Sequence, residues 1–351
     1  CGSIGSIKKG EEIHNEIVNS GMVLQQNVVV CTALVGMYVK CGALEKAEKL
    51  HTELCFRDRV SWNVLIGGYA QHERGEEALD CFERMQSEGF SPNEVTFVCI
   101  LKACCSTCAI ENGRNIHNEI VAKGFLERNI VLGNALVDMY AKCDALVDAK
   151  QVHGKLYMRD IVSWSSLITG YVQQRQYKEA LECFENLQSE DVSANEITFV
   201  SVLKACGSIG AINKGREIHD EISRRGFLKK SDELGNALVD MYAKCGVLSK
   251  AQEVLEQLRA RSIVSWSSLI AGYAQHGRGQ EALNCFDLMK KEGLSPDVVT
   301  FMAVLKACAN IGAIDKGKQI HDEIATLGLL NKDVVLGTAL VDMYAQCGVF
   351  S

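Results

Sequence analysis

The 351-residue sequence contains only two prolines, Pro92 and Pro296, and three tryptophans. Because proline interrupts helices, its near absence favours helix over most of the chain. The chain also lacks a positive charge excess, since 37 Lys and Arg residues stand against 44 Asp and Glu residues, a formal net charge of −7. This excludes a polycation that attracts nucleic acid by net charge alone. No apolar run approaches the length of a membrane span, so no membrane partner is expected.

Residue patterns typical of catalysis are missing as well. The sequence has no glycine-rich phosphate loop, nucleophile triad or paired acidic site, so we expect no catalytic residue, no cofactor and no small-molecule substrate. Cysteine, in contrast, is frequent, with 16 residues. Most recur at fixed spacing, as small buried apolar residues would, which favours a reducing compartment over a disulfide framework. The recurring cysteines are Cys41, Cys143, Cys245 and Cys347; Cys81, Cys183 and Cys285; and Cys104, Cys206 and Cys308.

The dominant pattern is a repeat with a period of 102 residues. Closely similar segments that start with Ser-Trp begin at Ser61, Ser163 and Ser265, and they contain the three tryptophans of the chain. A fixed period indicates an array of like structural units rather than one large core. Positions that are the same in every copy are then expected to serve packing, and positions that vary among constant neighbours are candidates for recognition.

Each period divides into units of 31, 35 and 36 residues, and each unit has the pattern of two helices. In the unit 59–93, apolar residues at helical spacing run from Trp62 to Tyr69 and again within 76–86, with Gly75 between the two stretches. Two antiparallel helices of this length cannot bury both apolar faces by themselves. Stacking on neighbouring pairs solves this, so the sequence predicts an all-α solenoid of stacked helix-turn-helix hairpins.

These hairpins resemble the pentatricopeptide repeat family. The segment SWNVLIGGYAQH from Ser61, the segment LVDMYAKC at 136–143 and the pattern V-x-VLKAC-x-x-x-G over 200–210 match its signatures, and the resemblance covers essentially the whole chain. The alternation of lengths resembles the S (31), P (35) and L (36) repeats of the PLS subclass, which occurs in plant organelle RNA editing factors. The resemblance implies a right-handed superhelical α-solenoid. The expected units are 1–27 (partial L), 28–58 (S), 59–93 (P), 94–129 (L), 130–160 (S), 161–195 (P), 196–231 (L), 232–262 (S), 263–297 (P), 298–333 (L) and 334–351 (partial S).

What the resemblance implies is binding of single-stranded RNA, one base per unit, read by the fifth and last residues of each unit. The implied reading pairs are Thr32 with Asp58 (G), Asn63 with Asn93 (pyrimidine, C preferred), Asn134 with Asp160 (U), Ser165 with Asn195 (A), Asn236 with Ser262 (C), Ser267 with Asp297 (G), and Thr338 (purine). The L units carry the aliphatic residues Val98, Val200 and Met302 at the fifth place and are expected to act as spacers. The implied target is 5′-G-Y-n-U-A-n-C-G-n-R-3′.

Each of these assignments has a structural alternative. The small polar residues at the fifth and last places could simply cap helices. The resemblance implies that second-place residues pack against bases, although ordinary packing between units is equally compatible with them; these residues are Val29, Val60, Val131, Val162, Val264 and Val335. In the third S unit Glu233 interrupts this series. The resemblance also implies phosphate contacts by Lys40, Lys142 and Lys244, whose alternative role is interaction with the helix dipole.

A recurring His-x-Glu triplet matches part of a catalytic motif. His14, His117, His219 and His321 each begin a His-x-Glu triplet, the spacing of a zinc-dependent base deaminase. The accompanying Pro-Cys-x-x-Cys is missing, so we interpret these histidines as structural. The spacing Cys105-x-x-Cys108 has no second ligand pair, so no zinc is expected.

The resemblance therefore implies that the chain is the RNA-targeting part of a cytidine-to-uridine editing factor of mitochondria or chloroplasts, acting with editing cofactor proteins or a further deaminase domain. The alternative function is a protein-binding scaffold, which the acidic charge favours. The chain begins at Cys1 rather than Met, and both ends fall inside a unit. We therefore expect it to be a piece of a longer protein.

Overall fold

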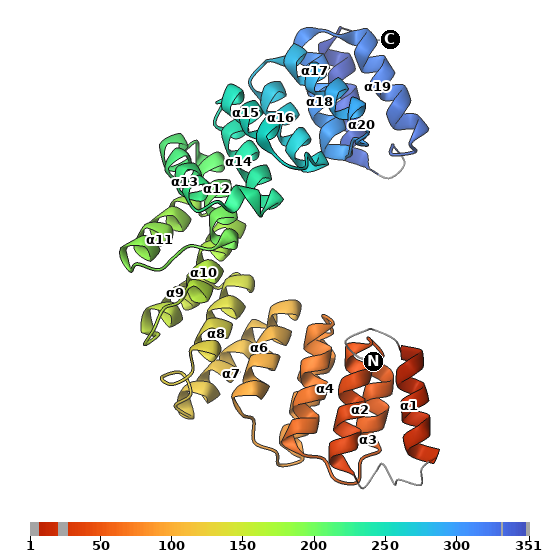
Figure 1. Ribbon diagram of the computed structural model, residues 1–351, viewed down its shortest axis with the longest axis vertical. Helices are drawn as coiled ribbons and strands as arrows, with labels where there is room; N and C mark the ends of the chain where they lie inside the picture. Colours follow the sequence, from red (N-terminus) through yellow and green to blue (C-terminus); the bar gives the residue numbers. More distant parts are fainter. Residues whose placement is uncertain (1–6, 20–26, 331–332, 349–351) are drawn as a thin grey trace. The chain divides into compact units, whose positions relative to one another are not determined.

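The computed structural model describes residues 7–19, 27–330 and 333–348. Every regular element in these residues is helical, as the sequence predicts. The chain divides into two compact bodies, an N-terminal body, Cys1–Gln174, and a C-terminal body, Arg175–Ser351. Each body is a stack of helix pairs (Figure 1).

In the N-terminal body the first helices of successive units form one continuous row. Helix α2 contacts α4, α4 contacts α6, α6 contacts α8, and α8 contacts α10. Each second helix packs on its own first helix and on the first helix of the next unit, as α5 does on α4 and α6. The helices are α1 (Ile7–Asn19), α2 (Val28–Lys40), α3 (Leu44–Thr52), α4 (Arg59–Gln71), α5 (Gly75–Ser87), α6 (Glu94–Thr107), α7 (Ile110–Ala122), α8 (Ile130–Lys142), α9 (Leu146–Lys155) and α10 (Ile161–Gln173).

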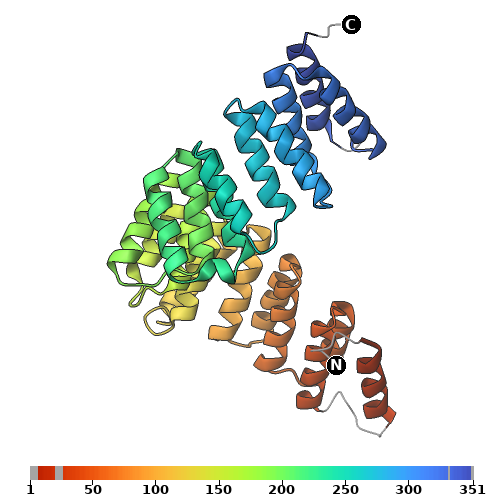
Figure 2. The ribbon, with the colours of Figure 1, turned by 45° about the horizontal axis from the view of Figure 1, so that its top comes forward.

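The C-terminal body repeats this arrangement, and Figure 2 shows its helices in green to blue. Helices α12, α14, α16, α18 and α20 form the row of first helices. The short 3₁₀ helix η2 (Phe227–Lys229) is an addition to the unit 196–231 and contacts α13 and α14. The remaining bounds are α11 (Tyr177–Ser189), α12 (Glu196–Ile209), α13 (Ile212–Arg224), α14 (Asp232–Lys244), α15 (Leu248–Gln257), α16 (Ile263–Gln275), α17 (Gly279–Lys291), α18 (Val298–Ile311), α19 (Ile314–Thr326) and α20 (Val334–Gln346).

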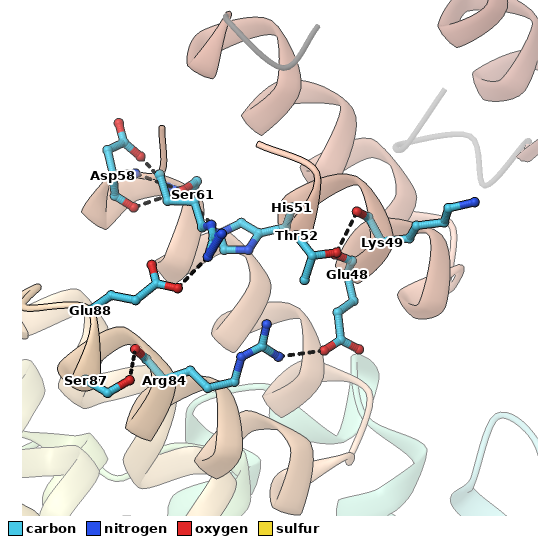
Figure 3. A network of polar contacts seen from close by, with 10 residues as sticks. Glu48, Lys49, His51, Thr52, Asp58, Ser61, Arg84, Ser87 and Glu88 are labelled. Carbon is cyan, nitrogen blue, oxygen red and sulfur yellow. Dashed lines mark hydrogen bonds and ion pairs between the residues drawn. The ribbon is translucent and has the colours of Figure 1, made fainter. Parts of the chain in front are cut away.

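The core lies between the helices and is made by the residues that repeat. In α4, Trp62, Leu65, Ile66 and Tyr69 are buried, as their spacing predicts. Charged groups of neighbouring helices pair at the edge of this core, and Figure 3 shows Arg84 with Glu48 among them. The guanidinium of Arg84 lies 5.6 Å from the centroid of the Trp62 ring and donates to Glu48 Oε1 at 2.9 Å. The apolar side chains of the core are therefore shielded from water, and the charged groups that border them stay paired with one another at its edge.

Left-handed turns join the two helices of a unit. Gly42, Gly246 and Gly277 adopt positive φ angles there, and at the equivalent places Glu73 and Asp144 do so as well, each with φ of 60°. Gly75 does not separate the helices, contrary to the expectation from sequence, but begins α5. It is buried, and a Cβ at this position would lie 2.7 Å from the carbonyl oxygen of Ala103. Its role is therefore close packing of α5 against α6.

The repeated cysteines pack as the sequence predicts in two of their three positions. Those of the second helices of the P units and those of the L units are buried, as with Cys81 and Cys104, whereas those that end the S-unit first helices, such as Cys143, are only half-buried. All cysteines of the described residues are free thiols. In the same part of the chain, none of the helices has the length and apolar character needed to cross a bilayer.

Candidate nucleic-acid interface

The last residue of each unit forms the N-cap of the next first helix. Asp58 Oδ1, for example, accepts from the backbone N–H of Ser61 at 2.8 Å, and Asn93 Oδ1 accepts from that of Thr96 at 3.0 Å. Asp160, Asn195, Ser262 and Asp297 cap their helices in the same way. Capping is thus a real role of the last-place residues, and it fixes their side chains at the N-terminal ends of the first helices.

The fifth-place residues are not caps, because they lie inside the helices. In three units the fifth-place side chain instead bonds to the last-place side chain of the same unit. Asn63 Nδ2 donates to Asn93 Oδ1 at 3.2 Å, and Ser262 Oγ donates to Asn236 Oδ1 at 3.2 Å. Asn134 Nδ2 lies 3.0 Å from both carboxylate oxygens of Asp160. The structure therefore brings together these two sequence positions, which lie 26 to 30 residues apart in the chain.

Other fifth-place residues are oriented differently. Ser267 is buried, and its hydroxyl donates to the carbonyls of Ile263 and Val264 on its own helix. Thr338 donates to Val334 in the same way, while Thr32 Oγ1 is buried without a hydrogen-bond partner. Ser165 is buried in the N-terminal body, and its expected partner, Asn195, belongs to the C-terminal body. All three units that carry asparagine at the fifth place make the direct pair.

The second-place valines have half or more of their surface exposed, so packing between units covers at most half of each residue. Val29 has 79% of its surface exposed, and the values for the second-place valines of the other S and P units run from 50% to 60%. The sequence analysis did not include the L units in this series, although their second residues are also aliphatic and could have been recognised by counting from the start of each unit. The exposed second-place residues are Val29, Val60, Val95, Val131, Val162, Ile197, Val264, Val299 and Val335. We refer to these nine as the aliphatic series.

The lysines near the ends of the S-unit first helices are exposed, but two of them form ion pairs with aspartates of the same helix. Lys142 Nζ contacts Asp138 Oδ2, and Lys244 Nζ contacts Asp240 Oδ2, each at 2.7 Å. Burial opposes the charged form of Lys142, but the hydrogen bond to Asp138 prevails and raises the pKa of the lysine. The i,i+4 spacing of Asp and Lys in the sequence could have predicted these pairs. Lys40 has Gly36 at the corresponding place.

All three kinds of candidate residue line one open groove in the N-terminal body. The groove has a volume of about 920 Å³ and is formed by α1, α2, α4 and α6. Val29, Lys40 and Asn63 all line it, from the second, thirteenth and fifth places of their units. The exposed apolar, positive and hydrogen-bonding groups therefore face a common space.

The histidines of the His-x-Glu triplets have a structural partner in each copy. His117 Nδ1 lies 2.9 Å from the hydroxyl of Tyr140, and His219 makes the same contact with Tyr242. His14 and His321 pair with Tyr38 and Tyr344. Burial lowers the pKa of His117 and His219, which keeps these rings neutral at pH 7. No group of three or more potential ligands that could hold a metal ion occurs in the described residues.

Comparison with known proteins agrees with the geometry. A family model described as the PPR repeat family matches residues 57–106, 159–208 and 261–310. A second model, described as PPR repeat, matches residues 29–57 and 236–263. Together the two models cover more than half of the chain.

Curated relatives of the whole chain come from Arabidopsis thaliana. The pentatricopeptide repeat-containing protein At1g11290, chloroplastic, is 36% identical over 99% of this chain. The corresponding value for the pentatricopeptide repeat-containing protein At3g09040, mitochondrial, is 34% over 99% of this chain. The chain spans 42% of the first relative and 34% of the second, that is, less than half of each.

Solved structures share the fold. The crystal structure of the pentatricopeptide repeat protein PPR10 in complex with an 18-nt psaJ RNA element matches 89% of this chain and 46% of its own, with a TM-score of 0.72 and 20% identity. The structure of PPR10 from maize matches 96% of this chain and 47% of its own, with a TM-score of 0.71 and 20% identity. With both the repeat models and the stacked helix pairs in agreement, the chain belongs to the pentatricopeptide repeat family.

Proposed function

We propose that the chain binds single-stranded RNA in a sequence-dependent manner, one base per S or P unit, with the target 5′-G-Y-n-U-A-n-C-G-n-R-3′. The observation that carries this proposal is the coincidence of two series at the same helix ends. An exposed aliphatic residue and a bonded pair of polar side chains occur together in two units, Val60 with Asn63 and Asn93 and Val131 with Asn134 and Asp160. In the unit 232–262 the pair of Asn236 and Ser262 follows Glu233 instead. A base needs both, an apolar contact for its face and polar groups for its edge.

The aliphatic series supplies the contact that does not depend on base identity. Val60 and Val131, for instance, have 60% and 55% of their surface exposed to solvent. Covering such side chains with a base removes apolar surface from water, which is favourable for any of the four bases.

The hydrogen bonds of Asn63 and Asn93 favour cytosine at that unit. Asn63 Oδ1 accepts from the hydroxyl of Thr96 at 2.6 Å, and Asn93 Oδ1 accepts from the backbone N–H of Thr96 and from Asn63 Nδ2. Asn93 Oδ1 accepts two of these hydrogen bonds and Asn63 Oδ1 one, so the side-chain N–H groups that are left outnumber the acceptor positions that the pair offers to a ligand. Cytosine presents acceptors at N3 and O2, which are complementary to these donors.

The pair of Asn134 and Asp160 has the opposite character and favours uracil. The Asn134 amide nitrogen is directed at the Asp160 carboxylate and lies 3.0 Å from both of its oxygens. A carboxylate only accepts hydrogen bonds, so the last residue of this pair offers acceptor positions to a donor from the ligand. The N3–H group of uracil is such a donor. Both units have asparagine at the fifth place. Their last residues differ in one group, which is the amide NH2 of Asn93 in one and a carboxylate oxygen of Asp160 in the other.

Within this proposal, the S, P and L alternation assigns the chain to the PLS subclass, and the chain serves as the targeting part of an organellar editing factor. The alternating unit lengths support this, as do relatives whose names include chloroplastic and mitochondrial. Such an array is a binding module, and the deamination itself would need an additional domain or partner protein.

A binding titration tests the central claim. The purified chain is titrated with a ten-nucleotide RNA of the proposed sequence and with a scrambled RNA of the same composition, at low and at physiological salt. We expect the proposed sequence to bind at least tenfold more tightly. Affinities within twofold of each other would show that the base assignments are wrong. Since two of the three S-unit lysines are paired with carboxylates, we also expect a shallow dependence on salt.

A protein-binding scaffold is the second candidate, and the exposed aliphatic series together with the net charge of −7 favours it. Exposed apolar residues in a row are also typical of protein interfaces. The same titration separates the two functions, because a scaffold would bind neither RNA even at low salt.

A further inference from the structure

Two thiols meet where α6 and α8 end. Cys108 caps the C-terminus of α6, and its backbone N–H bonds to the carbonyl oxygen of Cys104. The Cys143 thiol, at the end of α8, donates to that same oxygen at 3.5 Å. The Cys108 thiol lies 4.0 Å from the carbonyl oxygen of Cys105, so the two thiols approach adjacent carbonyl groups at the end of α6. One carbonyl group thus holds both cysteines at a single point between the L unit 94–129 and the S unit 130–160.

Among the described residues, the other junctions of this kind lack a second thiol. The equivalent junctions at Cys206 with Cys245 and at Cys308 with Cys347 keep the thiol-to-carbonyl bond, at 3.8 and 3.9 Å. Glycine stands there at the place of Cys108, however, namely Gly210 and Gly312.

Cys108 adopts a backbone conformation that suits those glycines. Its φ angle is 51°, and those of Gly210 and Gly312 are 70° and 64°. A residue with a Cβ pays a conformational cost at such an angle, which glycine does not. Cys108 is therefore strained at a position where the other copies have glycine, and the group that it adds there is a thiol.

Exposure, rather than acidity, makes Cys108 the first of the two thiols to react, because burial disfavours the thiolate of Cys143. Cys108 is exposed, while Cys143 is half-buried, and burial raises the pKa of the Cys143 thiol to about 11. A dissolved oxidant therefore meets Cys108 first. Cys105 lies nearby, but its thiol is directed at Asp138 Oδ2 at 3.9 Å, and no ligand cluster for a metal is found in the described residues.

We propose that Cys108 and Cys143 form a dithiol site that a small disulfide such as oxidised glutathione converts into a disulfide bond between the two units. The Cys108 thiolate attacks one sulfur of glutathione disulfide and releases one reduced glutathione. The Cys143 thiolate then attacks the Cys108 sulfur of the mixed disulfide and releases the second. Two protein thiols are oxidised, one glutathione disulfide is reduced, and the two protons end on the released glutathione thiols.

The bond would tie the ends of two neighbouring first helices together beside Lys142. It would close a loop of about 35 residues, a length for which a cross-link restricts the unfolded chain substantially. The proposal is independent of RNA binding, because it needs only the thiols and a disulfide reagent.

The test is oxidation of the reduced, folded chain with excess glutathione disulfide, followed by mass analysis under denaturing conditions. We expect the loss of two hydrogen atoms and a tryptic cross-link between peptides 103–114 and 143–150, reversed by dithiothreitol. Fragmentation of the first peptide must place the bond at Cys108. A glutathione adduct that remains on Cys108, a bond formed through Cys105, or an unreacted pair would each overturn the proposal.

Two variants provide matched controls. Cys108→Gly reproduces the glycine of the other L units and is expected to abolish the cross-link while retaining the fold. Gly210→Cys installs the missing thiol opposite Cys245. Nothing lies within 4 Å of a Cβ at Gly210, so the variant carries only the backbone strain that Cys108 already shows at its positive φ. We expect this variant to gain a second cross-link, to Cys245. Failure of that second bond to form, or a cross-link of equal yield in urea-unfolded wild type, would show that the folded geometry does not direct the reaction.

Discussion

The imidazole of His51 packs edge-on against the indole of Trp62, with ring centroids 4.5 Å apart and an interplanar angle of 65°. His51 Nε2 also lies 3.3 Å from the Ser61 hydroxyl, so the contact joins α3 of one unit to α4 of the next. His153 and Trp164 repeat it at 4.2 Å and 64°. The third copy carries Leu255 instead, and there Trp266 Nε1 donates to Glu292 at 2.9 Å.

We predict that these two histidines make the N-terminal body sensitive to acid. Burial lowers the pKa of both His51 and His153 from 6.5 to about 4, and for His51 the nearby Arg57 and Arg84 lower it further, against Glu48 and Asp58. The unfolded chain therefore binds protons below pH 6.5 before the folded chain does. Stability is complete above pH 6.5 and falls as the pH drops towards 4, by no more than about 2 kcal/mol per histidine at pH 5.

The measurement compares urea unfolding at pH 7.0 and pH 5.0 for wild type and for His51→Leu/His153→Leu, a change that copies the leucine of the third unit, Leu255. The double variant should lose much less stability between the two pH values than wild type. An equal loss in both proteins would assign the acid sensitivity to other groups.

Much of the fold follows from the sequence because packing repeats with the chain. The helical spacing of the apolar residues from Trp62 to Tyr69 predicts the buried face of α4. The last-place residue Asp58 is of a type that commonly caps helix N-termini, and it does so here. The exposure of Val60 does not follow, because an apolar residue in the first turn of a helix can face a neighbour or solvent. The bond between Asn63 and Asn93, and the approach of Cys108 to Cys143, depend on how successive hairpins stack, which no local pattern encodes.

Replacing strained turn residues with glycine should stabilise the array. Glu73 and Asp144 have φ angles of 60° at turns where other copies place Gly277, Gly42 and Gly246. Because a side chain disfavours this conformation, Glu73→Gly and Asp144→Gly are each expected to raise the free energy of unfolding by about 1 kcal/mol. Thermal unfolding measures the gain. Gly277→Glu, the reverse change in the third P unit, should cost a similar amount; a gain in stability there would contradict the argument.

The aliphatic series should contribute to RNA affinity and little to stability. Val60→Thr/Val131→Thr keeps shape and branching but replaces a methyl with a hydroxyl on two exposed side chains. We expect RNA affinity to fall roughly tenfold for the proposed and the scrambled sequence alike, given about 0.8 kcal/mol per buried methyl group. Unfolding should be unchanged. Val147 is 72% exposed on α9, a second helix, so Val147→Thr is the matched control that should leave RNA binding intact. If Val147→Thr lowered RNA affinity as much as Val60→Thr/Val131→Thr does, the second place would have no special role in RNA binding.

Exchanging one atom at the last place of two units should exchange their base preferences. Asn93→Asp gives the unit 59–93 the asparagine and aspartate pair of Asn134 and Asp160, and it turns a donor into an acceptor. Asp160→Asn makes the reverse change. Both residues cap a helix, and both side chains are good caps, so folding should be unaffected. We expect the second nucleotide of the RNA to change from C to U in the first variant and the fourth from U to C in the second, each with discrimination of about 1 to 3 kcal/mol. Binding is measured with RNAs that differ only at those two nucleotides, and the unchanged site of each variant is its internal control. If neither preference moves while both variants stay folded, the last-place residues act as helix caps alone.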